Sequence, residues 1–225
     1  MSNFIAVAID GPAGAGKSSV AKAVSKKLSY IYADTGALYR AVGLYMVNKG
    51  IDTKDADAVA KTVSEDNIEI NIAFFEDGQH VILNGEDVSG KIRTPEISMA
   101  ASNVSAVPAV RQFLFDLQRD LAKKNNIIMD GRDIGTVVLP NAQVKIFLTA
   151  SAEERANRRC KELTEKGMEV NYNEILEDIK KRDDQDMNRP IAPLKAADDA
   201  VIIDSSDMNF EEVVEALIKT IKEKI

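Results

Sequence analysis

The sequence is poor in the residues that support redox or zinc chemistry. It holds one cysteine, Cys160, and one histidine, His80, in 225 residues. A single thiol cannot form an internal disulfide, and a zinc site needs several Cys or His ligands at short spacing. These two absences exclude disulfide-stabilised scaffolds and zinc-dependent chemistry.

Positive charge is also in short supply. Lys and Arg number 29 against 36 Asp and Glu, which gives a net charge of −7. Nucleic acids and anionic membranes select for extended positive surfaces, which this composition disfavours. The apolar run from Phe4 to Ile9 is too short for a signal peptide or a membrane span. We therefore expect a cytoplasmic protein that binds neither nucleic acid nor membrane.

A complete phosphate-binding motif is present near the N-terminus. Residues 11–18 read GPAGAGKS, which fits G-x-x-x-x-G-K-[ST]. The glycines leave backbone N–H groups open toward phosphate oxygens, and Lys17 supplies a mobile positive charge. Ser18, or Ser19 beside it, offers a hydroxyl to the Mg²⁺ that accompanies a nucleotide. The expected ATP-binding residues are Gly11, Pro12, Ala13, Gly14, Ala15, Gly16, Lys17, Ser18 and Ser19.

The hydrophobic periodicity predicts an α/β fold with a small inserted subdomain. Apolar runs that alternate with helical patterns are typical of a parallel sheet. After the first strand, the expected parallel strands lie at about residues 30–33, 126–130, 144–148 and 200–203. Over residues 68–88 the period changes to 2, with turns at Asp77-Gly78 and Asn84-Gly85, which predicts an antiparallel meander. His80 falls in or near the first of these turns, and we expect it to be exposed to solvent.

Polar residues follow the strand that ends at Asp130. The string from Asp130 to Thr136 reads DGRDIGT, and ligands bind beyond the carboxyl ends of strands in doubly wound sheets. Asp130 could organise hydrated Mg²⁺, while Arg132 and Asp133 could bind and orient a second substrate. The alternative is a capping loop with an internal ion pair.

Arginines on two predicted helices are candidates for binding anions. On the helix at about residues 37–47, Gly36 and Gly43 lie on the same face as Arg40, which predicts open space beside the guanidinium. The helix at about residues 151–166 carries three arginines in its first two turns, suited to phosphate oxygens. They are Arg155, Arg158 and Arg159. The alternative for each helix is a solvated surface.

The pattern of the helix at about residues 172–188 changes from apolar to charged. Its stripe comprises Tyr172, Ile175, Leu176 and Ile179, then Arg182, Asp183 and Asp186. Because an unpaired buried charge is costly, we expect the charged half to leave the core and line a polar cleft. Arg189 keeps to the same side. The alternative is a helix that projects into solvent.

Five segments of the sequence, taken in order, resemble the bacterial cytidylate kinases, and the resemblance covers essentially the whole chain. They are residues 11–19, residues 34–40 (DTGALYR), residues 85–93 (GEDVSGKIR), residues 130–136, and Arg182-Asp183 through Asp186 to Arg189. The resemblance implies a nucleoside monophosphate kinase fold whose parallel sheet has the order 2-3-1-4-5. It also implies transfer of the γ-phosphoryl group of ATP to CMP or dCMP with Mg²⁺.

The resemblance assigns roles to individual residues. Thr35, Arg40, Arg132 and Arg189 resemble ligands of the acceptor phosphate; Ser102, Arg111 and Asp133 resemble the cytosine-reading residues; Arg182 and Asp186 resemble the residues at the sugar. Arg155, Arg158 and Arg159 are similar to lid arginines, so the expected catalytic set is Lys17, Arg132, Arg155, Arg158, Arg159 and Arg189. Relatives often have serine in place of Thr35, which retains the hydroxyl.

The expected organisation is a single kinase domain over residues 1–225, acting as a monomer. We expect a core at about residues 1–36, 107–150 and 190–225, an acceptor-binding region with the meander at about 37–106, and a lid with the charged helix at about 151–189. Two other functions fit the phosphate-binding loop. One is a kinase for another small acceptor such as UMP, and the other is a regulatory module that binds ATP without turnover.

Overall fold

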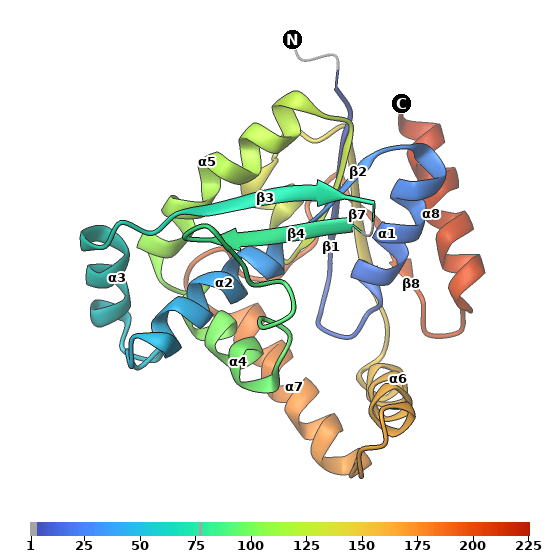
Figure 1. Cartoon of the computed structure of the whole chain (residues 1–225). Helices are drawn as coiled ribbons and strands as arrows, with labels where there is room; N and C mark the ends of the chain where they lie inside the picture. The colour runs from blue at the N-terminus through green and yellow to red at the C-terminus, as the bar shows by residue number, and fades with distance from the viewer. Residues whose placement is uncertain (1–3, 77) are drawn as a thin grey trace. The chain divides into compact units, whose positions relative to one another are not determined.

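The computed structural model describes residues 4–76 and 78–225, which divide into two compact units (Figure 1). The first unit contains the chain up to residue 31 together with residues 125–225, and the second contains residues 32–124. The phosphate-binding loop and the charged helix both belong to the first unit.

The first unit is built on a parallel sheet in the order β2-β6-β1-β7-β8. Numbered 1 to 5 along the chain, the strands of this sheet (β1, β2, β6, β7 and β8) have the order 2-3-1-4-5. The expected α/β fold and strand order are therefore confirmed. The central strand β1 (Ala6–Asp10) is buried throughout and pairs in parallel with β6 (Ile127–Gly131) and β7 (Val144–Thr149). An uninterrupted apolar run suits such a strand, because both faces of a parallel sheet are covered.

The outer strands complete this sheet. On one side β8 (Val201–Asp204) pairs in parallel with β7. On the other, the first residue of β2 (Ile31–Asp34) donates its backbone N–H to the carbonyl of Asn126 at 2.9 Å. Each expected parallel strand is therefore present, with ends that differ from the sequence-based ranges by a few residues.

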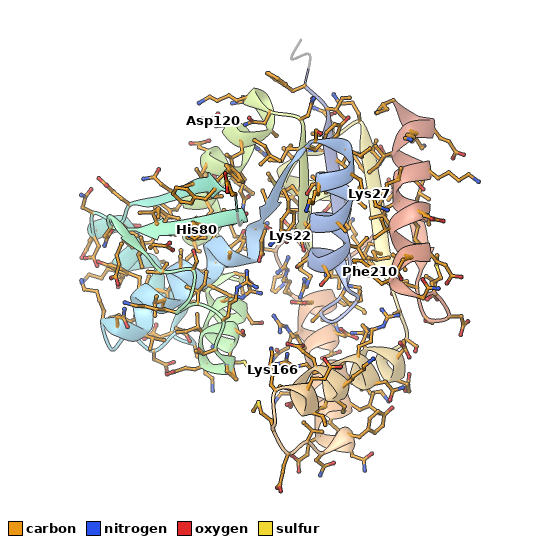
Figure 2. The ribbon with its side chains drawn as sticks, turned by 45° about the vertical axis from the view of Figure 1, so that its right-hand side comes forward. Lys22, Lys27, His80, Asp120, Lys166 and Phe210 are labelled. Carbon is orange, nitrogen blue, oxygen red and sulfur yellow. The ribbon has the colours of Figure 1, made fainter. Side chains whose placement is uncertain are left out.

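Two helices of the first unit, α1 (Lys17–Leu28) and α8 (Phe210–Lys224), lie side by side (Figure 1). In Figure 2, Lys27 marks α1 and Phe210 marks the first turn of α8. The start of α8 is fixed by a capping box, in which Asn209 and Glu212 each bind the other's backbone N–H. A local sequence signal therefore sets where α8 begins.

The remaining helices of the first unit follow the two inner strands. A single π-helical turn, η1 (Ile134–Val138), follows β6, and α6 (Ala152–Glu165) follows β7. Helix α6 packs along α7 (Tyr172–Asn188), and the chain turns between them just beyond Lys166 (Figure 2). Both α6 and α7 match their predicted ranges closely.

The second unit combines four helices with the predicted meander. The helices are α2 (Thr35–Asn48), α3 (Ala56–Glu65), α4 (Pro95–Val104) and α5 (Pro108–Lys124). The meander is an antiparallel sheet of β3 (Ile70–Phe75), β4 (Gly78–Leu83) and β5 (Glu86–Asp87). The turn at Asn84-Gly85 has φ of 50° and 83°, which is the conformation that favours these residue types. The other predicted turn includes Asp77, which lies outside the described residues.

Two expectations for the second unit are wrong. His80 lies in β4, two residues after the predicted turn, but it is half-buried rather than exposed, and its Nδ1 is 2.6 Å from Asp87 Oδ2. The expected gap beside Arg40 is closed at Gly43, where an added Cβ would lie 3.1 Å from the Cβ of Ala100 on α4. Gly43 therefore lets two helices approach each other.

Among the described residues, no helix is long and apolar enough to cross a membrane.

Candidate active site

The loop between β1 and α1 is folded as an open cradle. Gly11 has φ of 150°, and a Cβ there would lie 1.9 Å from the carbonyl oxygen of Leu148, so only glycine fits. Gly14 and Gly16 adopt φ of 78° and 82°, the left-handed region in which glycine is favoured. No side chain caps the start of α1. Its first N–H groups can therefore bind an anion.

Lys17 is the buried cation of this cradle. Its residue is 6% exposed, and Nζ donates to the carbonyl oxygen of Pro12 at 2.7 Å. Burial and the nearby charge of Arg132 lower the pKa of Lys17 to about 7, against the opposing effect of nearby carboxylates. An anion between these two cations would favour the charged ammonium. The electrostatics of the cradle therefore suit a polyphosphate.

Ser18 and Asp130 form a pair of oxygen ligands beside the cradle. Ser18 Oγ donates to Asp130 Oδ2 at 2.8 Å, and Asp130 is 4% exposed. In the described part of the chain, no group of three or more His, Cys, Asp and Glu side chains could hold a metal ion. Mg²⁺ is commonly bound by one or two protein oxygens, with phosphates and water supplying the rest. The Ser18 and Asp130 pair fits that kind of site.

Asp10, at the end of β1, also belongs to this region. Its carboxylate accepts from the backbone N–H groups of Ile134 and Gly135, each at 2.7 Å. Burial raises the pKa of Asp10 to about 6, although the two N–H bonds and Lys17 oppose the rise; the charge of Asp133 adds to it. Sequence reasoning missed this residue. The available signal was a carboxylate directly after four apolar residues of a buried strand.

The residues after β6 are held by two ion pairs. Arg132 Nε donates to Asp186 Oδ2 at 2.7 Å. Arg189 NH2 lies 3.3 Å from Asp133 Oδ1, and Arg189 Nε donates to the carbonyl oxygen of Ala192 at 2.7 Å. Four residues that the sequence predicts for acceptor binding are thus brought together. A fifth, Arg182, lies half-buried on α7.

The burial of α7 is the reverse of the expectation. Its apolar half is half-buried or exposed, whereas Asp183 and Asp186 in its charged half are buried. The buried carboxylates are paired with arginines from other segments, which offsets the cost of removing them from water. Asp183 receives two hydrogen bonds from the guanidinium of Arg155, at 3.0 and 2.5 Å. Sequence reasoning placed Asp183 on the stripe but missed this role.

The three arginines of α6 have different surroundings. Arg155 also donates to the carbonyl oxygens of Ala13 and Ala150, so it ties the cradle to α7. Arg158 donates to Ser205, and its NH1 lies 4.0 Å from a Cβ built at Gly16. Arg159 is 44% exposed and pairs with Glu162. The structure therefore brings Arg155 and Arg158 to the cradle and leaves Arg159 on the surface of α6.

The other predicted acceptor residues lie in the second unit. Arg40 NH1 is 3.4 Å from Asp34 Oδ2, and the other oxygen of Asp34 caps α2 by accepting from Ala37 N–H. Thr35 is buried at the start of α2. Ser102 is half-buried on α4. Arg111 is buried on α5, and its guanidinium lies 5.6 Å from the ring centre of Phe115.

Comparison with known proteins places this geometry in a family. The family model described as cytidylate kinase matches residues 7–223. The cytidylate kinase of Caldicellulosiruptor saccharolyticus is 52% identical over 215 residues, covering 96% of this chain and 94% of that protein. The cytidylate kinase of Carboxydothermus hydrogenoformans is 48% identical over 218 residues, with 97% of both chains covered.

A solved structure shows a similar fold at much lower identity. An uncharacterised protein from Eubacterium ventriosum matches with a TM-score of 0.50 and 16% identity, covering 98% of this chain and 99% of that chain. The assignment to a family rests on the family model and on relatives that align along nearly the whole length. The chain therefore belongs to the cytidylate kinase family and is a kinase of that family.

Proposed function

We propose that the protein transfers the γ-phosphoryl group of ATP to CMP or dCMP, releasing ADP and CDP or dCDP. The observation that carries the proposal is the arrangement around Lys17. The buried ammonium lies within the electrostatic reach of Arg132, which is itself paired with Asp186. A triphosphate cradle and residues suited to a second substrate are therefore part of one network in the first unit.

The donor half is formed by the loop of residues 11–19. Its uncapped helix start and Lys17 would bind the phosphates of ATP, and Arg158 beside Gly16 would add a second positive charge. Ser18 and Asp130, paired at 2.8 Å, would hold Mg²⁺, with Asp130 acting through water. When bound, Mg²⁺ would neutralise part of the phosphate charge. The Asp130 bond favours Ser18 over Ser19 as the metal-facing hydroxyl.

The acceptor half is proposed to draw on both units. Arg132 and Arg189 would bind the phosphate of CMP, together with Thr35 and Arg40. Arg182 and Asp186 would contact the sugar. Ser102, Arg111 and Asp133 would read the cytosine, because a hydrogen-bonding site strongly rejects a base with the wrong donor pattern. In the structure Asp186 and Asp133 accept from Arg132 and Arg189.

The transfer itself needs positioning and charge more than a strong base. A phosphate oxygen of CMP would attack the γ-phosphorus as the bond to the β-phosphate oxygen breaks, so ADP leaves with that electron pair. The transition state is loose, with charge spread over the transferring oxygens. Lys17, Arg132, Arg155, Arg158, Arg159 and Arg189 are the proposed catalytic set. Arg155 is bound by Asp183 and two carbonyl groups, so we propose that it acts by holding the loop.

An acceptor screen tests this function against its alternatives. ADP release is followed with MgATP and each of CMP, dCMP, UMP, AMP and GMP at equal concentration. We expect CMP or dCMP to give the highest kcat/KM, with AMP and GMP poor acceptors. A higher value for UMP would favour a different acceptor. ATP binding with no ADP release in the presence of any acceptor would favour a regulatory module that binds ATP without turnover.

A further inference from the structure

The carboxylate of Asp10 joins two segments that are distant in the chain. It ends β1, and its two oxygens accept from the consecutive N–H groups of Ile134 and Gly135, which lie 124 and 125 residues later. Both bonds are 2.7 Å long, and Asp10 is 4% exposed. A hydrogen bond between a carboxylate and an N–H group is short and strong in a site that excludes water.

The segment that Asp10 holds is a π-helical turn. In η1 the Leu139 N–H donates to Ile134 at 2.7 Å and the Val138 N–H donates to Asp133 at 3.2 Å, which is the spacing of a π-helix. The first N–H groups of a helix have no partner within it, and the side chain of Asp133 does not cap this one. Asp10 supplies the cap from another strand.

The chain leaves room for this contact at Gly135. A Cβ at Gly135 would lie 3.3 Å from Asp10 Oδ2 and 3.2 Å from Lys145 Cδ. Both distances are tighter than ordinary van der Waals contact, so a side chain there would push the carboxylate and Lys145 away. Glycine therefore lets the carboxylate approach the backbone of η1 closely.

Asp10 and the turn η1 each lie next to residues proposed to bind a substrate. Asp10 immediately precedes Gly11, the first residue of the ATP cradle. The turn that it caps begins immediately after Arg132 and Asp133, whose side chains pair with Asp186 and Arg189. One carboxylate thus fixes the backbone of the acceptor residues relative to the start of the donor loop.

We propose that Asp10 is a positioning residue that orients Arg132 and Asp133 for the acceptor nucleotide by capping the turn η1. This inference rests on the proposed function, because it names the residue that holds part of that acceptor site. Asp10 touches neither substrate in this account. It acts through the backbone of residues 133–135.

Asp10→Asn is the direct test, because the variant keeps the size of the side chain. An amide oxygen can accept from one N–H group, while its NH₂ group faces the other donor and leaves it without an acceptor. We expect the Kd for CMP, measured by calorimetry without ATP, to rise about tenfold, and the Kd for a non-hydrolysable ATP analogue to change less than about threefold. Amide hydrogen exchange at Ile134 and Gly135 should become faster.

Two further variants test whether a loss of CMP binding comes from the contact between Asp10 and η1. Asp204→Asn removes a carboxylate that also ends a strand and accepts from a backbone N–H, that of Ser206, and it should leave both Kd values unchanged. Gly135→Ala disturbs the same contact from the opposite side and should also weaken CMP binding selectively. If Asp10→Asn does not fold, Gly135→Ala decides the matter by the same two Kd values.

The outcomes separate this inference from the proposed function. If the wild type binds and phosphorylates CMP but neither variant weakens CMP binding, the role of Asp10 is refuted and the function stands. Equal loss of both ligands would indicate a general structural role and would likewise refute it. A wild type that binds no CMP would refute the proposed function, and the positioning role with it.

Discussion

Ser18 Oγ lies 2.8 Å from Asp130 Oδ2, although 112 residues separate them in the chain. The hydroxyl belongs to the first turn of α1, which follows the phosphate-binding loop, and the carboxylate belongs to β6, which pairs with β1. This contact places the two candidate metal ligands together. It is the reason for proposing Ser18, rather than Ser19, as the hydroxyl that faces the metal.

The first prediction concerns that choice. Ser18→Ala removes a hydroxyl ligand, so the Mg²⁺ concentration that gives half-maximal activity should rise several-fold, whereas Ser19→Ala should leave it nearly unchanged. The measurement is a Mg²⁺ titration of kcat at saturating ATP and CMP. Equal Mg²⁺ requirements of the two variants would contradict the assignment to Ser18.

The second prediction concerns Lys17. Lys17→Ala should lower kcat by a factor of about 10² or more, because the charge of the ammonium is lost from the transition state. Lys27→Ala is the matched control, since it removes an exposed lysine from the same helix (Figure 2). Near-normal turnover of the Lys17→Ala enzyme in steady-state assays would show that the loop is not the donor site.

The third prediction concerns the buried pair of Arg155 and Asp183, whose side chains are 5% and 12% exposed. Asp183→Ala leaves a buried guanidinium without its carboxylate, which should cost about 3–5 kcal/mol of unfolding free energy. Glu162→Ala, at the exposed pair with Arg159, should cost less than about 1 kcal/mol. Urea unfolding of both variants gives the comparison, and similar losses would contradict the structural role assigned to the buried pair.

The fourth prediction is a pH dependence of stability from Asp10. Its pKa is about 6 in the folded protein against 3.8 ordinarily, so the folded state binds the proton more tightly than the unfolded chain does. The resulting stabilisation is complete below about pH 4 and is lost as pH rises through about 6. Stability relative to Asp10→Asn should therefore fall by about 2–3 kcal/mol between pH 4 and pH 7. A difference that grows with pH over this range would have the wrong sign.

Much of the fold follows from local patterns in the sequence. The loop of residues 11–18, the parallel strands and the meander each depend on signals a few residues long. Pro108 begins α5, and Asn209 with Glu212 begins α8, where the capping rules place them. Such features agree with the structure because the interactions that produce them are themselves local.

The pairing of charges could not be predicted in the same way. The stripe on α7 shows that Asp183 and Asp186 face one side, but their partners, Arg155 and Arg132, lie 28 and 54 residues earlier. Without knowledge of those partners, we expect the charged half to leave the core and line a polar cleft, whereas the structure buries both carboxylates. Asp10 was missed for the same reason, because its two N–H donors, those of Ile134 and Gly135 in η1, lie 124 and 125 residues later.

Transfer of labelled phosphate is the most direct test of the proposed reaction. The enzyme is incubated with Mg²⁺, CMP and ATP labelled with ³²P at the γ-phosphate, and the products are separated. We expect label in the β-phosphate of CDP, in an amount equal to the ADP formed, with little inorganic phosphate. Label that appears only as inorganic phosphate, or an absence of labelled CDP while CMP is present, would contradict it.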